Sequence, residues 1–430
     1  MSTSHPSRWT ELFLLPLPIA FVALGLTLIN LTLPGRVQQS HLLAAALALL
    51  LLLVSHLVLL WRHPRADQLL LPLVAMLSSM GLVMVSRLAP ELALRQAIWL
   101  TVGMLLMLAI IIFLPRVAIL QNYKYTSAAL GFALVAATFL FGDDPNGSGA
   151  RLWLTVGGRY FQPSEILKLL LVVFLAGYLE DKRELLSWSS SRLGGLKLPP
   201  LPYLGPLAVM WGVSMMMLVA QRDLGATLLL FGIFLAMLYM ASGRFIYAWG
   251  GLAAFFAGTS LCYLLFAHFR NRVVVWMDPW SRASNEGYQV VQALVALASG
   301  GVLGAGLGNG YPGYIPAIQT DFIIAAIGEE MGLAGSLAVV ALFMVLVYRG
   351  FRIALDAEDG FSSLLAAGLT TILGLQAVVI LAGTLKLIPI TGITLPFISY
   401  GGSSIITNFI ILGLLLRISA QRGGTRAPQH

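Results

Sequence analysis

Residues 321–348 read DFIIAAIGEEMGLAGSLAVVALFMVLVY, a long apolar run that carries three carboxylates. About 20 apolar residues are enough for a helix to cross a hydrocarbon core of ~30 Å. Asp321 stands at the membrane edge of this run, and Glu329 and Glu330 lie about two helical turns further in. Carboxylates are costly in that setting and are functional candidates by default. The stretch therefore predicts a transmembrane helix with a candidate site at its start.

Similar apolar runs recur along the whole chain of 430 residues. Hydrophobic residues make up 58% of it and charged residues 10%, with a mean hydropathy of +0.88. A soluble domain carries roughly 25% charged residues, so that class is excluded. We expect an all-α polytopic membrane protein with about twelve transmembrane helices. The expected spans are 12–31, 41–61, 68–88, 96–114, 125–141, 163–180, 204–221, 223–242, 246–267, 321–348, 362–384 and 396–417.

The first two spans hold almost no charge within the membrane. We interpret residues 1–65 as an accessory transmembrane hairpin, followed by a core over 66–418 and a polar tail over 419–430. The lone Cys262 excludes a disulfide scaffold, and the six histidines show no metal-ligand spacing.

Charge patterning predicts the orientation. The net charge of +8 is dispersed over short loops, which suits anionic lipid headgroups better than nucleic acid. A modest majority of the 26 Lys and Arg residues lie on the side of the N-terminus, so both termini are predicted to be cytoplasmic. The loops 142–162 and 268–320 then face outward. The second is unusually long and contains the amphipathic segment 288–298, which predicts a short helix in the membrane interface.

Two polar clusters lie before and within the middle spans. Arg151 precedes the first of these spans, and Glu165 and Lys168 face the same way because they are three residues apart on a helix. A helix start with an internal ion pair explains them as well as a ligand site does. A lysine one turn into the membrane nevertheless needs a carboxylate or an anionic ligand. The second cluster contains Asp223, which a tight outer turn would also explain.

The carboxylates of the run 321–348 form a third cluster. Positions eight apart on an ideal helix are offset by ~80°, so Asp321 and Glu329 can flank one cavity while Glu330 points elsewhere. Helix capping by Thr320 or Asp321 is the alternative explanation for the aspartate, but it does not account for the glutamates.

The fourth cluster is the segment 389–404, which has two prolines, three glycines and several hydroxyl groups, among them Ser399 and Ser403. Irregular backbone is tolerated in a membrane only where it is buried in protein or lines a cavity. Gly401 and Gly402 permit a close approach of the backbone to a ligand. The four clusters predict an outward-facing cavity in which a carboxylate acts as general base and cations hold a diphosphate.

Five segments of the chain form a recognisable set: QPSEILK (162–168), QRDLGAT (221–227), YQVVQ (288–292), TDFIIAAIGEE (320–330) and LPFISYGGSS (395–404). In this order they resemble the signature segments of the SEDS family of bacterial cell-wall proteins, which includes RodA, FtsW and SpoVE. The resemblance covers residues 68–417. Many members have His and Glu where Gln319 and Ala317 stand here, and the family commonly has ten spans, so residues 12–61 are an added pair on a core closest to RodA and FtsW.

The resemblance implies a peptidoglycan glycosyltransferase that polymerises lipid II on the outer face of the cytoplasmic membrane, for elongation or division, with a class B penicillin-binding protein as partner. It implies that Asp321 is catalytic, by taking a proton from the acceptor sugar, and that undecaprenyl diphosphate leaves with inversion at the donor carbon. It also implies that Arg151, Glu165, Lys168 and Asp223 line the cavity. No cofactor is required by the sequence, but a divalent cation is compatible with the diphosphate chemistry.

Two other classes of protein fit some of these features. A lipid II flippase or a transporter of lipid-linked oligosaccharides also needs a polar cavity among helices, although no internal repeat is evident. A non-catalytic scaffold for cell-wall enzymes would not need Asp321, Lys168 and Glu329.

Overall fold

The computed structural model describes residues 8–35, 37–144, 151–183, 191–193, 196–198, 212 and 223–421. Within these ranges, ten helices are long and apolar enough to cross a membrane, which confirms the polytopic all-α class. Helix α7 (Pro163–Asp181) is as long but carries four charged residues and is not among the ten. The span predicted at 204–221 lies outside the described residues except for residue 212.

The described residues form two compact units. The first comprises those within 1–115, 262–350 and 376–424, and the second those within 116–261 and 351–375. Asp321 and the segment 389–404 belong to the first unit, whereas Glu165, Lys168 and Asp223 belong to the second.

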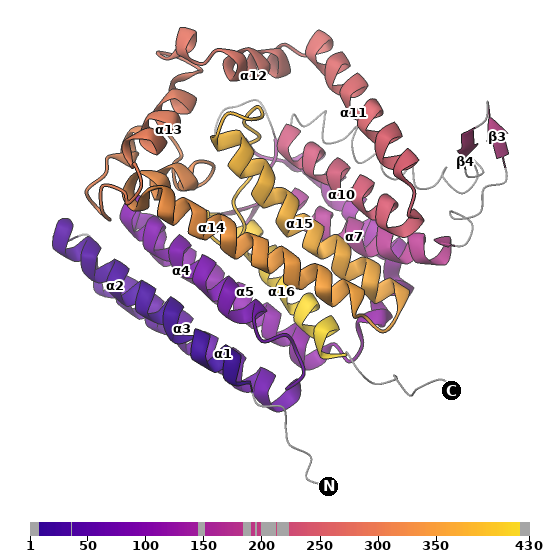
Figure 1. Cartoon of the computed structure of the whole chain (residues 1–430), viewed down its shortest axis with the longest axis horizontal. Coiled ribbons are helices and arrows are strands. Elements are labelled where there is room, and N and C mark those ends of the chain that lie inside the picture. The colour runs from indigo at the N-terminus through magenta and orange to yellow at the C-terminus, as the bar shows by residue number, and fades with distance from the viewer. Residues whose placement is uncertain are drawn as a thin grey trace. The chain divides into compact units, whose positions relative to one another are not determined.

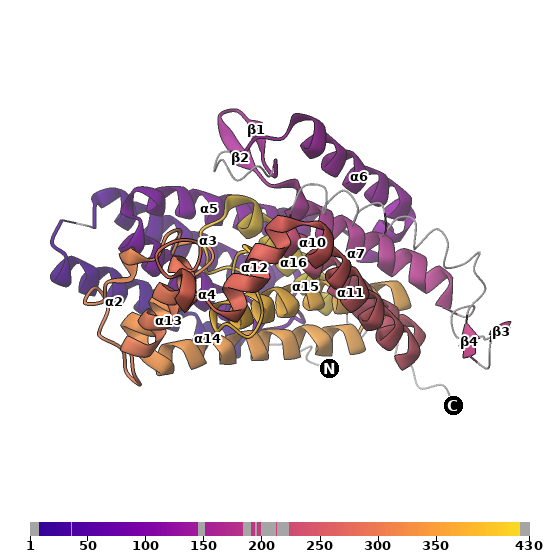
Figure 2. The same cartoon turned by 90° about the horizontal axis from the view of Figure 1, so that it is seen from above.

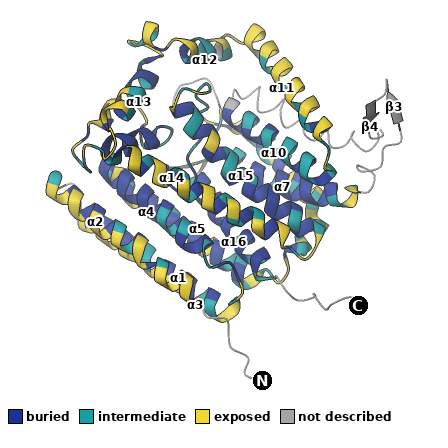
Figure 3. Ribbon diagram, viewed as in Figure 1, coloured by how far each residue is buried: buried dark blue, intermediate teal, exposed yellow. Residues whose placement is uncertain are grey.

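The first unit begins with helices that run side by side (Figure 1). Helix α5 packs against α16, α3 and α4, and α2 packs against α4. The central helices α4 and α16 are mostly buried (Figure 3). A Cβ at Gly103 of α5 would lie 2.7 Å from the ring of Phe409 in α16, so this glycine allows close helix packing. The helices are α1 (Trp9–Leu14), α2 (Pro16–Thr32), α3 (Gln39–Arg62), α4 (Leu70–Leu88), α5 (Pro90–Phe113) and α16 (Gly402–Ala420).

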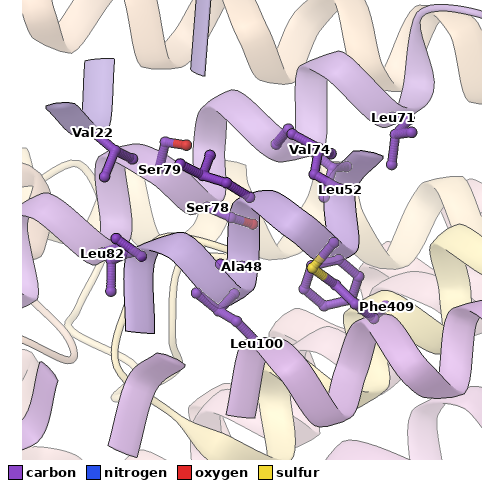
Figure 4. Close-up of a pocket in the computed structure, with 14 residues that line it drawn as sticks. Val22, Ala48, Leu52, Leu71, Val74, Ser78, Ser79, Leu82, Leu100 and Phe409 are labelled. Atoms are coloured by element: carbon purple, nitrogen blue, oxygen red, sulfur yellow. The ribbon is translucent and has the colours of Figure 1, made fainter. Parts of the chain in front are cut away.

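The N-terminal helices enclose a small apolar cavity of about 40 Å³ against the rest of the unit (Figure 4). Val22 of α2, Leu52 of α3 and Val74 of α4 line it, and Phe409 of α16 closes one side. Its polar lining includes the hydroxyl-bearing Ser78 and Ser79. This composition is typical of a packing gap between apolar helices.

The predicted outer loop contains two short helices before the long helix α14 (Ile323–Leu355). They are α12 (Ala267–Met277) and α13 (Tyr288–Ser299), joined by the short helix η2 (Trp280–Arg282) and followed by η3 (Pro312–Tyr314). Helix α13 confirms the helix predicted over 288–298. Figures 1 and 2 place α13 beside the N-terminal end of α14.

Helix α14 is interrupted at Gly332, which has φ 67° and ψ −167°. The backbone groups freed at the break bond to the glycine-rich loop that follows α13. Ala305 N–H donates to the Glu329 carbonyl at 2.9 Å, and Leu333 N–H donates to the Gly301 carbonyl at 2.9 Å. The break is therefore satisfied by protein, as irregular backbone at membrane depth requires.

The second unit is organised around α7, on which α6 (Lys124–Phe141) and α10 (Leu224–Ser242) pack. The predicted outer loop 142–162 contains an antiparallel hairpin that the sequence pattern did not predict. Its strands β1 (Leu154–Val156) and β2 (Arg159–Phe161) pair Leu154 with Phe161, and Gly157 and Gly158 supply the positive φ angles of the turn. The remaining elements are η1 (Val117–Tyr123), the antiparallel pair β3 (Ser191–Leu193) and β4 (Leu196–Leu198), α11 (Phe245–Leu265) and the first part of α15 (Gly360–Thr384).

Two helix starts differ from the expected ones because proline acts locally. Helix α5 begins at Pro90, six residues before the expected 96, because proline is well suited to the first helical turn. Helix α16 begins at Gly402 rather than 396, because Pro396 and the left-handed Phe397 (φ 65°) keep the preceding segment irregular.

Candidate active site

Asp321 lies in a turn two residues before α14 and is half-buried. Its side chain borders two pockets of the first unit, the larger with a volume of about 220 Å³. The larger pocket is walled by α12, by α13 and by the segment 383–392 at the end of α15. Besides Asp321, the charged residues that line it are Arg272, Glu286 and Lys386.

The segment 395–400 holds the Asp321 turn by its backbone. The Ser399 hydroxyl donates to the Thr320 carbonyl at 2.5 Å and accepts from the Leu395 N–H at 3.0 Å. Tyr400 N–H donates to the Gln319 carbonyl at 2.8 Å. Ser399 is thus a positioning residue, because it bonds to the residue before Asp321.

Residues with unfavourable backbone conformations lie near this turn. Among the described residues, three that are not glycine have positive φ angles: Ala317 (52°), Lys386 (59°) and Phe397 (65°). Ala317 precedes Asp321 in its own turn, Lys386 lines the larger pocket, and Phe397 lies in the segment that holds the turn. Such residues tend to collect at functional sites, where surrounding structure maintains them.

Burial raises the pKa of Asp321 to about 6, against the opposing effects of the Thr320 hydroxyl and the Arg272 guanidinium. A carboxyl group with this pKa is mostly ionised at neutral pH. It is also a stronger base than an ordinary aspartate, because the ideal pKa of a general base lies near the working pH.

Two cations of the pocket, Arg272 and Lys386, were missed by the sequence reasoning. Arg272 Nη1 donates to the Ile390 carbonyl at 3.0 Å, and Trp276 Nε1 donates to the Lys386 carbonyl at 3.0 Å. The four-residue spacing of Arg272 and Trp276 on one helix face was an available signal. Lys386 gave no signal beyond a positive charge at the end of a span.

The structure does not place Glu329 in either pocket beside Asp321. Its Oε1 accepts from the Tyr311 N–H at 2.7 Å. Glu330 is buried, with its Oε1 3.0 Å from Arg87 Nε, and Arg87 Nη2 donates to the Gly310 carbonyl at 3.0 Å. The glycine-rich loop after α13 lies on that face of the helix, and the pairing of Asp321 and Glu329 around one cavity stays a prediction.

The glycines at the start of α16 approach protein and not an open site. A Cβ at Gly402 would lie 2.5 Å from the indole of Trp99, and one at Gly401 would lie 3.2 Å from Thr394. Ser403 is buried in the first turn of the helix. These contacts explain the glycines by packing, and a role for them toward a ligand stays a prediction.

The remaining predicted residues lie in the second unit. Lys168 Nζ and Glu165 Oε2 form a buried ion pair at 2.6 Å on α7, as their spacing predicted. Asp223 Oδ1 accepts from the Ala226 N–H at 3.0 Å and caps α10. Arg151 is exposed and precedes β1. Within the described ranges, no group of three or more His, Cys, Asp or Glu side chains is arranged to hold a metal ion.

Known proteins with similar sequences agree on one family. The family model FtsW/RodA/SpoVE, described as cell cycle protein, matches residues 61–423. The peptidoglycan glycosyltransferase RodA of Mycobacterium tuberculosis (strain ATCC 25618 / H37Rv) is 40% identical over 385 residues, which are 87% of this chain and 81% of the relative. The probable peptidoglycan glycosyltransferase FtsW of Geobacter sp. (strain M18) is 37% identical over 298 residues, covering 68% and 77% of the two chains.

A solved structure shows the same architecture. It is described as "Structural coordination of polymerization and crosslinking by a peptidoglycan synthase complex", and its chain matches with a TM-score of 0.70 and 28% identity. The match covers 84% of this chain and 99% of the solved one. From the family match over most of its length and from these relatives, the chain belongs to the FtsW/RodA/SpoVE family of membrane proteins.

Proposed function

We propose that this protein is a peptidoglycan glycosyltransferase that polymerises lipid II on the outer face of the cytoplasmic membrane, with Asp321 as the general base. The names of the RodA and FtsW relatives support the activity. The observation that carries the assignment to Asp321 is its placement, half-buried beside a pocket of about 220 Å³ that also holds two cations.

The proposed reaction uses Asp321 to accept the proton of the 4-hydroxyl group of an acceptor lipid II. That oxygen attacks the anomeric carbon of the donor glycan, and the bond from this carbon to the diphosphate breaks. Undecaprenyl diphosphate leaves with the bonding electrons, and the configuration at the carbon inverts. The leaving diphosphate needs positive charge nearby, for which the sequence offered Lys168, Arg151 or a divalent cation.

The cellular setting belongs to the same proposal. We place both termini in the cytoplasm on the basis of the Lys and Arg distribution. The partner would be a class B penicillin-binding protein that crosslinks the new strands. The similar chain described within a peptidoglycan synthase complex of polymerization and crosslinking supports this choice.

The direct test is lipid II polymerisation by the purified full chain in liposomes, with and without its class B partner. Glycan strands of increasing length are expected on gels when wild-type protein is present. Two results together would assign the protein as a flippase and not as an enzyme. No glycan strands would form under any partner or cation condition, and labelled lipid II would move between leaflets.

The rate of polymerisation is expected to depend on the ionisation of Asp321. Because the pKa of Asp321 is about 6, the carboxylate is protonated at lower pH and cannot accept a proton. The rate should fall about tenfold per pH unit well below this value and level off above pH ~7. Initial rates measured between pH ~4.5 and ~8 on intact liposomes test this, and a rate that stays constant down to the lowest pH would contradict it.

A further inference from the structure

Lys386 occupies a backbone position that normally favours glycine. Helix α15 ends at Thr384, and Lys386 follows with φ 59°. Its N–H donates to the Gly383 carbonyl at 3.1 Å, and the Leu387 N–H donates to the Ala382 carbonyl at 2.8 Å. A left-handed residue just after a helix is usually glycine, because a Cβ there crowds the backbone. The turn itself therefore gives no reason for a lysine.

Two hydrogen bonds from α12 fix the backbone around Lys386. The Trp276 indole N–H donates to the carbonyl of Lys386 itself, and the Arg272 guanidinium donates to the Ile390 carbonyl, both at 3.0 Å. These bonds hold the segment against α12, so Lys386 lines the same pocket as Arg272 and Asp321. The two hydrogen bonds from α12 thus hold Lys386, with its strained backbone conformation, in the pocket that Asp321 also lines.

The side chain of Lys386 is half-buried. Among the described residues, its ammonium group forms no ion pair. Glu286 also lines the pocket, but its Oε2 lies 3.9 Å from Arg282 Nη1, on the exposed surface. The pocket has a volume of about 220 Å³. It therefore presents the ammonium of Lys386 and the charge of Arg272 to an anionic group, with the carboxylates of Asp321 and Glu286 beside them.

In an inverting transfer, the base and the leaving group act on opposite faces of a single carbon atom. A cation that neutralises the leaving diphosphate must therefore lie within about one sugar of Asp321. We propose that Lys386, together with Arg272, binds the diphosphate of the donor lipid in this pocket. The proposal rests on the glycosyltransferase function above and assigns the diphosphate to these residues in place of Lys168 and Arg151. Lys386 supplies a compact charge, and the guanidinium of Arg272 adds a second positive charge beside it.

The substitution Lys386→Gly removes the charge of the side chain without straining the backbone. Glycine adopts the φ of this position without strain, so the variant should melt at the wild-type temperature or above it. Loss of one charged hydrogen bond to the donor is expected to lower kcat/KM for lipid II about ten- to hundredfold. Lys386→Arg keeps the charge and should recover most of the activity. Wild-type kinetics in Lys386→Gly, or a loss that Lys386→Arg does not relieve, would overturn the proposal.

A binding measurement separates this proposal from the proposed function. Farnesyl diphosphate serves as the probe for the detergent-purified full chain, with farnesol as the probe without phosphate. Wild-type protein should bind the diphosphate more tightly than farnesol, and Lys386→Gly should weaken diphosphate binding about ten- to hundredfold without changing farnesol binding. Arg270→Gln is the matched control, since Arg270 lies on the same helix, is exposed and does not line the pocket.

The outcomes are distinguishable. If wild-type protein binds farnesyl diphosphate through Lys386 but makes no glycan with any partner, the proposed function fails and the anion site stands. If wild-type protein makes glycan but Lys386→Gly binds the probe as wild type does, the Lys386 assignment fails and the function stands.

Discussion

Replacing Asp321 by asparagine should reduce lipid II polymerisation by about a hundred- to ten-thousandfold, the usual contribution of a general base. Asparagine has nearly the same shape but cannot accept the proton of the attacking hydroxyl. The half-buried turn is held through the backbone of Thr320 and Gln319, so the substitution leaves those hydrogen bonds in place. Single-turnover rates with labelled lipid II, in the presence of the class B partner, measure the effect.

The matched control is Asp278→Asn. Asp278 lies in the same stretch between α11 and α14, directly after α12, but it is exposed and is not among the residues that line the pockets beside Asp321. This variant should polymerise lipid II at close to the wild-type rate. Glycan strands that form equally well with Asp321→Asn would leave the reaction intact but remove Asp321 as its base.

The second large effect is on stability and concerns Arg87. The substitution Arg87→Met leaves the carboxylate of Glu330 buried without its cation and also removes a hydrogen bond to the Gly310 carbonyl. Breaking a buried ion pair from one side costs about 3–5 kcal/mol. The variant should unfold at a clearly lower temperature in detergent.

The double variant Arg87→Met/Glu330→Gln tests this reason. It removes the isolated charge, so it should recover a large part of the lost stability. Arg183→Met is the control for loss of an arginine as such, because the Arg183 side chain is exposed and an ion pair formed by an exposed arginine contributes about 0–1 kcal/mol. If the single and double variants had the same melting temperature, the isolated charge of Glu330 would not be the cause of the lost stability.

Apolar length predicted most helices of the described chain because the thickness of a membrane sets the length of a span. It placed the start of α16 six residues too early, because Pro396 and the left-handed Phe397 delay the helix. The irregular segment itself was expected from its glycines and prolines. The β1–β2 hairpin was not, because three-residue strands leave too little pattern in a sequence.

Part of the candidate site could be predicted from the sequence because placing a charged side chain in a membrane costs free energy. Asp321 was selected because a carboxylate at a membrane edge is expensive. Glu329 was grouped with it because both were placed on one ideal helix, but α14 begins two residues after Asp321 and a distant loop meets Glu329. Arg272 and Lys386 share a pocket because α12 packs against the segment after α15. Residues so far apart in the sequence form no local pattern from which this contact could be predicted.

The interruption of α14 at Gly332 constrains how the protein can be assembled. Four backbone hydrogen bonds join the break to residues 301–306: those of Ala305, Gly306, Leu333 and Ala334. Unsatisfied peptide groups cost several kcal/mol each in hydrocarbon, so the two halves of α14 cannot settle as a broken span by themselves. During biogenesis, this segment must either enter as a continuous helix that later breaks or form its break only once residues 301–306 lie beside it. The glycine-rich loop over residues 301–306 is thus a folding partner of the helix that follows it.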